Sequence, residues 1–128
     1  ISSRINSTWG GNLVDMVRSQ RIIEVIEEDA LLANVTEVGA HLLEGIVELE
    51  RLFPGKVSNG RGRGFFLAFD LPDTDTRNRT LTALNDSDVL GLASGDRAIR
   101  MRPPLVLTRG EADLGLRRIE RALATILG

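Results

Sequence analysis

The sequence predicts an α+β fold, in which a small, mostly antiparallel sheet is covered by helices. Three long segments repeat apolar residues about every 3.6 positions, as amphipathic helices do. Several short apolar runs bounded by turn residues have the length of strands. The expected order is two helices, two strands, one helix, two strands and a last helix, which is typical of α+β proteins. The length of 128 residues suits one domain with a substantial hydrophobic core.

The first helix is expected over residues 13–28, where the apolar positions form one broad face. Asn12, followed three residues later by Asp15, fits the cap that begins such a helix. We expect Asp29 to end it.

The second helix is expected to run to about Phe53, with Asn34 as its cap and Pro54-Gly55 as its end. The only histidine, His41, lies beside the apolar stripe of this helix. Without a second histidine to share a metal ion, it is better interpreted as a residue at the edge of the core than as a ligand.

The first two strands should meet at the glycine-rich residues 59–64, with a buried strand over residues 65–71. The Arg-Gly repeat at Arg61 and Arg63 also resembles RNA-binding segments. It has only two repeats, adjoins a strand and lies in a chain of net charge −2, so we favour a glycine-rich turn between two strands.

In the second half, the pattern predicts a polar loop at 72–79, a short helix at 77–84, and strands at 89–94 and 98–102 joined by a tight turn at Gly95-Asp96. Arg100 and Arg102 alternate with apolar residues, so both should leave the same face of the sheet. Thr108 and Glu111 form a capping box that begins the final helix.

Composition excludes several functions. Sixteen basic and eighteen acidic residues argue against a general nucleic-acid or membrane-surface binder. There is no cysteine and one histidine, so we expect neither thiolate chemistry nor a metal site. No apolar run approaches the ~20 residues of a membrane span and no signal peptide is visible, so we expect a cytoplasmic protein. Because the chain begins with Ile, we expect a piece of something longer.

Two features have the chemistry of a binding site. Residues 7–12 read Ser-Thr-Trp-Gly-Gly-Asn just before a helix, where hydroxyls, backbone N–H groups and the helix dipole can hold an anion. A plain turn with a helix cap explains the same residues. The second feature is the pair Arg100 and Arg102 on a strand that ends at Pro103-Pro104. An arginine there can bind a carboxylate bidentately, or it can be solvated or form a surface ion pair.

Taken together, three motifs change this balance: residues 7–12, the Arg-Gly-Arg-Gly of residues 61–64 before an aromatic strand, and Ile-Arg-Met-Arg-Pro-Pro-Leu at 99–105. In this order they resemble the C-terminal part of class III, pyridoxal-phosphate-dependent aminotransferases. Residues 3–18 are most similar to the lysine 6-aminotransferase branch, since general members usually carry Phe or Tyr at the position of Trp9 and Asn-Pro where this chain has Asn12-Leu13.

The resemblance implies roles for four residues. Thr8, with Ser7 beside it, matches the position that reaches the phosphate of pyridoxal 5'-phosphate in the neighbouring subunit. Arg100 matches the residue that binds the substrate α-carboxylate, in both half-reactions, and Asn6 matches a position near the substrate pocket. Arg102 occupies a variable position and receives no role.

The resemblance also implies a fold-type I small domain over residues 13–128, preceded by an active-site turn at 1–12, in a homodimer. The implied reaction moves the terminal amino group of L-lysine to 2-oxoglutarate, giving glutamate and 2-aminoadipate 6-semialdehyde. No motif for the cofactor-binding lysine occurs here, so no catalytic residue is assigned and the piece is expected to be inactive and free of cofactor alone. The alternative is a free-standing α+β module that binds a carboxylate without catalysis.

Overall fold

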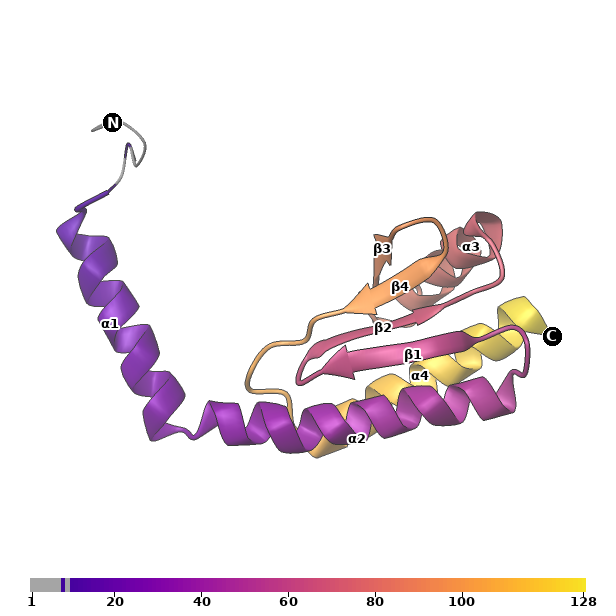
Figure 1. Cartoon of the computed structure of the whole chain (residues 1–128), viewed down its shortest axis with the longest axis horizontal. Coiled ribbons are helices and arrows are strands. Elements are labelled where there is room, and N and C mark those ends of the chain that lie inside the picture. Colours follow the sequence, from indigo (N-terminus) through magenta and orange to yellow (C-terminus); the bar gives the residue numbers. More distant parts are fainter. Residues whose placement is uncertain (1–7, 9) are drawn as a thin grey trace. The chain divides into compact units, whose positions relative to one another are not determined.

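The computed structural model describes residue 8 and residues 10–128, which divide into two units, residues 1–32 and residues 33–128. The first unit contains helix α1, Leu13–Glu28 (Figure 1). Its backbone begins at the predicted cap, because the Asn12 side chain accepts a hydrogen bond from the N–H of Val14 at 3.0 Å. Asp29 caps its other end.

Helix α1 buries none of its residues within its own unit. Leu13, Val17 and Ile23 of its apolar stripe are each more than half exposed. Its polar side is tied by surface ion pairs such as that between Arg18 and Asp15 at 3.1 Å.

The second unit is a two-layer structure. Its strands β1 (Ser58–Arg63), β2 (Phe66–Asp70), β3 (Leu92–Ser94) and β4 (Ala98–Met101) form one antiparallel sheet in the order β1-β2-β4-β3. Helices α2 (Leu31–Leu52), α3 (Thr74–Asn85) and α4 (Arg109–Leu127) complete the elements. The α+β prediction and the order of its eight elements are confirmed.

The core lies between one face of the sheet and the helices. Alternation along β2 and β4 directs Leu67, Phe69 and Ile99 toward the helices, where they are buried. The helices supply the other half of the core with Leu42, Ile46, Leu49, Leu84, Ile119 and Leu123. Within this unit, the helices cover only this one face of the sheet (Figure 1).

Helix α2 begins at Leu31, so the predicted cap at Asn34 was wrong. Asn34 lies in the first turn, and its amide donates to the carbonyls of Leu105 at 2.8 Å and Leu107 at 3.1 Å. This side chain ties the segment after β4 to α2, a long-range role that the local pattern did not reveal.

The predicted glycine-rich turn is confirmed only at its end: Ser58–Arg63 is strand β1, and the turn into β2 lies at Gly64-Phe65. The glycines of β1 allow a close approach instead. A Cβ at Gly60 would lie 2.8 Å from a methyl of Ile46, and one at Gly62 would lie 2.4 Å from the carbonyl oxygen of Phe66. The pairing of β1 with β2 is irregular between Ser58 and Arg61, as at a β-bulge.

The polar loop predicted at 72–79 is shorter and the following helix is longer. The Asp73 carboxylate accepts from the N–H of Thr76 at 2.8 Å, so α3 already begins at Thr74. The strand predicted at 89–94 covers only Leu92–Ser94, because the N–H of Val89 donates to the carbonyl of Leu84 and closes α3.

The capping box of the last helix is confirmed: Thr108 and Glu111 each bond the other's backbone N–H. In the part of the chain that the structure describes, no single helix is long and apolar enough to span a membrane. Helices α1 and α2 meet that length and composition only when they are taken together.

Candidate functional site

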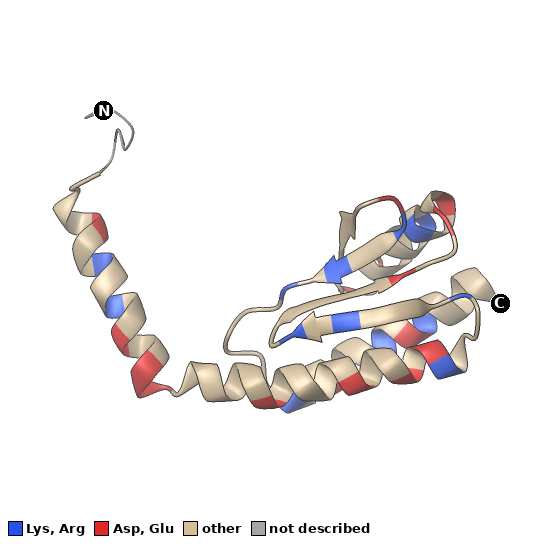
Figure 2. Ribbon diagram, viewed as in Figure 1, with Lys and Arg blue, Asp and Glu red and all other residues tan. Residues whose placement is uncertain are grey.

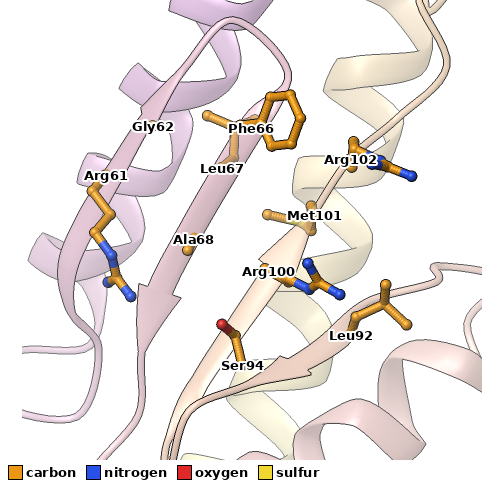
Figure 3. Close-up of a pocket in the computed structure, with 10 residues that line it drawn as sticks. All are labelled: Arg61, Gly62, Phe66, Leu67, Ala68, Leu92, Ser94, Arg100, Met101 and Arg102. Atoms are coloured by element: carbon orange, nitrogen blue, oxygen red, sulfur yellow. The ribbon is translucent and has the colours of Figure 1, made fainter. Parts of the chain in front are cut away.

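The open face of the sheet carries a cleft of about 350 Å³ (Figure 3). Its floor is Ala68 on β2, which pairs with Arg61 of β1 on one side and Arg100 of β4 on the other. Residues that pair directly across neighbouring strands share a face, so the two arginines flank a position with only a methyl group. Phe66 and Leu92 add apolar walls.

Arg100 is held on this face by its neighbours in the strand. Ile99 is fully buried and Met101 packs against the core, which fixes the direction of β4 and turns Arg100 outward. Arg100 is exposed, and within the described part of the chain it has no hydrogen-bond or ion-pair partner. It therefore offers a guanidinium that is free to bind a carboxylate bidentately.

Arg61 is occupied. Its Nη1 donates to Oδ1 of Asp70 at 2.8 Å and to the carbonyl of Asn59 at 2.8 Å. Asp70 is buried and also accepts from the Asn59 amide at 3.1 Å, while Arg97 lies 3.8 Å from its Oδ2. Burial raises the pKa of Asp70, but the hydrogen bonds from Asn59 and Arg61 and the two arginine charges outweigh it and lower the pKa.

Arg102, the third arginine of the cleft, lies over the ring of Phe66 at 5.8 Å from its centroid. This is a cation–π contact, which holds the side chain against the apolar wall. Arg61 is thus committed to Asp70 and Arg102 stacks on Phe66, whereas Arg100, beside Ala68, has neither kind of partner among the described residues.

Figure 2 shows basic positions (blue) on β1 and β4 and an acidic one (red) on β2. The predicted shared face of Arg100 and Arg102 is confirmed, since both line the cleft. The sequence analysis missed Asp70 and its pairing with Arg61. The available signal was an acidic residue that ends an apolar strand and shares a face with Phe66 and Ala68.

The other predicted site residues lie in the first unit. Thr8 is exposed in a turn, and Gly10, Gly11 and the Asn12 cap of α1 follow it. Ser7 and Asn6 lie outside the described residues. Gly11 has φ +83° and open space around it, so backbone conformation rather than packing requires glycine there.

The chain's one lysine has a structural role. The Lys56 ammonium donates to the carbonyl of Leu127 and lies 3.5 Å from that of Gly128. It therefore binds carbonyls at the C-terminal end of α4. Within the described residues, no group of three or more histidine, aspartate or glutamate side chains could hold a metal ion.

Known proteins with this sequence pattern are aminotransferases. Residues 2–123 match the family described as aminotransferase class III. L-lysine-epsilon aminotransferase from Amycolatopsis lactamdurans is 46% identical over 126 residues, which cover 98% of this chain and 28% of that protein. The enzyme of the same name from Streptomyces clavuligerus is 40% identical, with the same coverage.

A solved structure agrees with this match. Lysine aminotransferase from M. tuberculosis superposes with a TM-score of 0.90 at 40% identity, over 98% of this chain and 29% of that one. The chain thus spans somewhat less than a third of the length of these relatives. The match of sequence and fold over nearly all of its residues shows that the chain belongs to the class III aminotransferases.

Proposed function

We propose that this chain is part of an enzyme that transfers the 6-amino group of L-lysine to 2-oxoglutarate. The products would be glutamate and 2-aminoadipate 6-semialdehyde. The observation that carries the proposal is Arg100, an unpaired arginine in a cleft on a fixed strand, in a chain 40–46% identical to lysine-epsilon aminotransferases. Its contribution would be to bind the α-carboxylate of 2-oxoglutarate.

The geometry suits that task. A carboxylate above Ala68 would meet the guanidinium of Arg100, while Leu92 and Phe66 flank the carbon chain. A rigid strand fixes the carboxylate and so orients the neighbouring reacting carbon, which lowers the entropic cost of reaching a reactive geometry. Filling the cleft also removes water from around the ion pair and strengthens it.

Pyridoxal 5'-phosphate is the cofactor that the family implies, and the described residues fit one part of it. The exposed hydroxyl of Thr8, followed by two glycines and the N-terminus of α1, is a donor set suited to a phosphate. Bound there, the cofactor would act as the electron sink for the reaction. We assign Thr8, with Ser7, to the phosphate of a neighbouring subunit in a cytoplasmic homodimer, and Asn6 to the rim of the substrate pocket.

Lys56 is occupied at the end of α4, so the proposal places the cofactor-binding lysine in the rest of the enzyme. The 128-residue chain would then be inactive and free of cofactor when it is produced alone. The alternative, a free-standing module that binds a carboxylate, would bind its ligand without the cofactor and without the rest of an enzyme.

The test is an assay of the full-length protein that contains this chain. Glutamate formation from L-lysine and 2-oxoglutarate should exceed that from ornithine in kcat/KM, and the 128-residue chain should form none. A full-length protein that prefers ornithine, or that forms no glutamate from lysine, would contradict the proposed donor.

A further inference from the structure

A carboxylate that could compete for Arg100 lies beside the cleft, next to Arg61. Asp70 lies on the same open face of the sheet, and its Cα partner across the strand pair is Ala98. Arg100 is two residues beyond Ala98, so it is the diagonal neighbour of Asp70. Diagonal neighbours on one face of an antiparallel pair lie about 7–8 Å apart, within reach of a long side chain.

A buried, unpaired carboxylate would attract such a neighbour strongly, because leaving it without a partner costs its full desolvation energy. Asp70 is not left in that state. Arg61 and the Asn59 amide each hold one of its oxygens, at 2.8 and 3.1 Å, and Arg97 adds a second charge at 3.8 Å. Each oxygen thus accepts one hydrogen bond from the β1 side, and the Arg97 charge lies near Oδ2 from the turn before β4.

Because Asp70 is already paired with Arg61, Arg100 does not need to neutralise it. Arg61 satisfies Oδ1 of Asp70, and Arg100 on the other flank of Ala68 keeps its guanidinium unpaired among the described residues. Figure 3 shows the two arginines on either side of Ala68.

We propose that Arg61 is a positioning residue: by holding Asp70 it keeps Arg100 available for the carboxylate of the substrate. This inference rests on the proposed function of Arg100 and extends it to the groups that control its charge. Arg61 itself does not touch the substrate. Removing it would free Oδ1 of Asp70, and Arg100 would turn to that carboxylate.

The test uses the full-length holoenzyme and two readouts: KM for 2-oxoglutarate, and the dissociation constant of glutarate, an unreactive dicarboxylate, by titration calorimetry. Arg61→Gln keeps much of the side chain and loses the charge. We expect both constants to rise about tenfold, the loss of one hydrogen bond to a charged group, with little change in kcat. Arg61→Lys, which keeps the charge beside Asp70, should stay within about threefold of wild type.

The decisive variant is the double substitution Arg61→Gln with Asp70→Asn. Removing the competing carboxylate should restore both constants to near wild type, although the ion pair is lost. A merely structural role for the pair, or direct contact of Arg61 with the substrate, would leave the double variant as impaired as the single one, and either result would overturn the proposal. Should the glutamine variant fail to fold, Arg61→Ala gives the same comparison.

Arg63→Ala is the matched control, because Arg63 is exposed on the same strand and is not assigned to the site. It should leave both constants unchanged. A tenfold effect of this variant would show that the affinity for the dicarboxylate depends on the general positive charge of this face, and not on the pairing of Arg61 with Asp70. A fall in glutarate affinity in Arg100→Ala would show that Arg100 binds a carboxylate, whichever amine is the donor. The positioning role of Arg61 can therefore be tested even if the proposal of lysine as the amino donor fails.

Discussion

His41 of α2 lies 2.5 Å from Asp113 of α4, measured from Nε2 to Oδ1, and the pair joins two helices that cover the sheet. The hydrogen bond from His41, with the charges of His41, Arg109 and Arg117, lowers the pKa of Asp113. The folded-state pKa is thus below the unfolded value of about 3.9. Stabilisation from Asp113 is therefore complete above that value and is lost as pH falls through the folded pKa.

Asp113→Asn should consequently lower the free energy of unfolding near neutral pH, and the difference from wild type should shrink as the pH falls below about 4. Urea denaturation followed by circular dichroism measures it. Glu120→Gln, an exposed carboxylate on the same helix, is the control and should show no such convergence. A deficit for Asp113→Asn that is independent of pH would assign the effect to packing.

The contact between α2 and the β1–β2 turn gives a second prediction. A Cβ at Gly39 would lie 2.5 Å from the carbonyl oxygen of Gly64, and backbone cannot move aside as a flexible side chain can. Gly39→Ala should therefore destabilise the fold by about 1–3 kcal/mol through overpacking. Gly115→Ala, on α4 with open space around it, should instead stabilise by up to about 1 kcal/mol through helix propensity. Thermal unfolding of the two variants checks both signs.

The sequence predicted correctly those features that depend on residues close together in the chain. The bounds of α1 and the capping box at Thr108 follow from side chains within a few residues of each other, so the sequence contains all of the relevant information. The face shared by Arg100 and Arg102 follows from the period of two in a strand. Their place beside an open cleft needed the strand order, which no local pattern contains.

The errors arose where a distant partner decides. Asn34 has the composition of a cap, but the carbonyls of Leu105 and Leu107 claim its amide from more than 70 residues away. Gly60 and Gly62 were assigned to a turn because glycine is frequent there, whereas close packing against Ile46 and the β2 backbone requires them. The pairing of Arg61 with Asp70 depends on the register of β1 against β2 in the same way.

The proposed phosphate contact of Thr8 gives a third prediction. Thr8→Ala in the full-length enzyme should raise the dissociation constant of pyridoxal 5'-phosphate by about tenfold to a hundredfold, the loss of one hydrogen bond to a charged group. Titration of the apoenzyme with cofactor measures it. Thr125→Ala, on the exposed side of α4, should leave the constant unchanged. Equal affinity in the Thr8 variant and wild type would remove Thr8 from the site.

The role of Arg100 gives the last prediction. The reacting carbon of 2-oxoglutarate adjoins its α-carboxylate, whereas the reacting amine of lysine is separated from the α-carbon by four methylene groups. Both reacting ends must reach the same cofactor, so an arginine fixed on β4 that fits the first carboxylate is badly placed for the second. This narrows the role in both half-reactions that the resemblance implied for Arg100 to the half-reaction of 2-oxoglutarate and glutamate. Arg100→Ala should therefore raise KM for 2-oxoglutarate by about tenfold to a hundredfold, and KM for lysine by less.

Steady-state kinetics with each substrate varied in turn separates the two constants. Arg100→Lys should fall between wild type and alanine, because lysine keeps the charge but cannot offer a planar, bidentate pair of donors. Arg102→Ala is the matched control, since that side chain stacks on Phe66 in the same cleft. If Arg102→Ala raises KM for 2-oxoglutarate as much as Arg100→Ala does, the carboxylate is held by the positive face as a whole and not by Arg100.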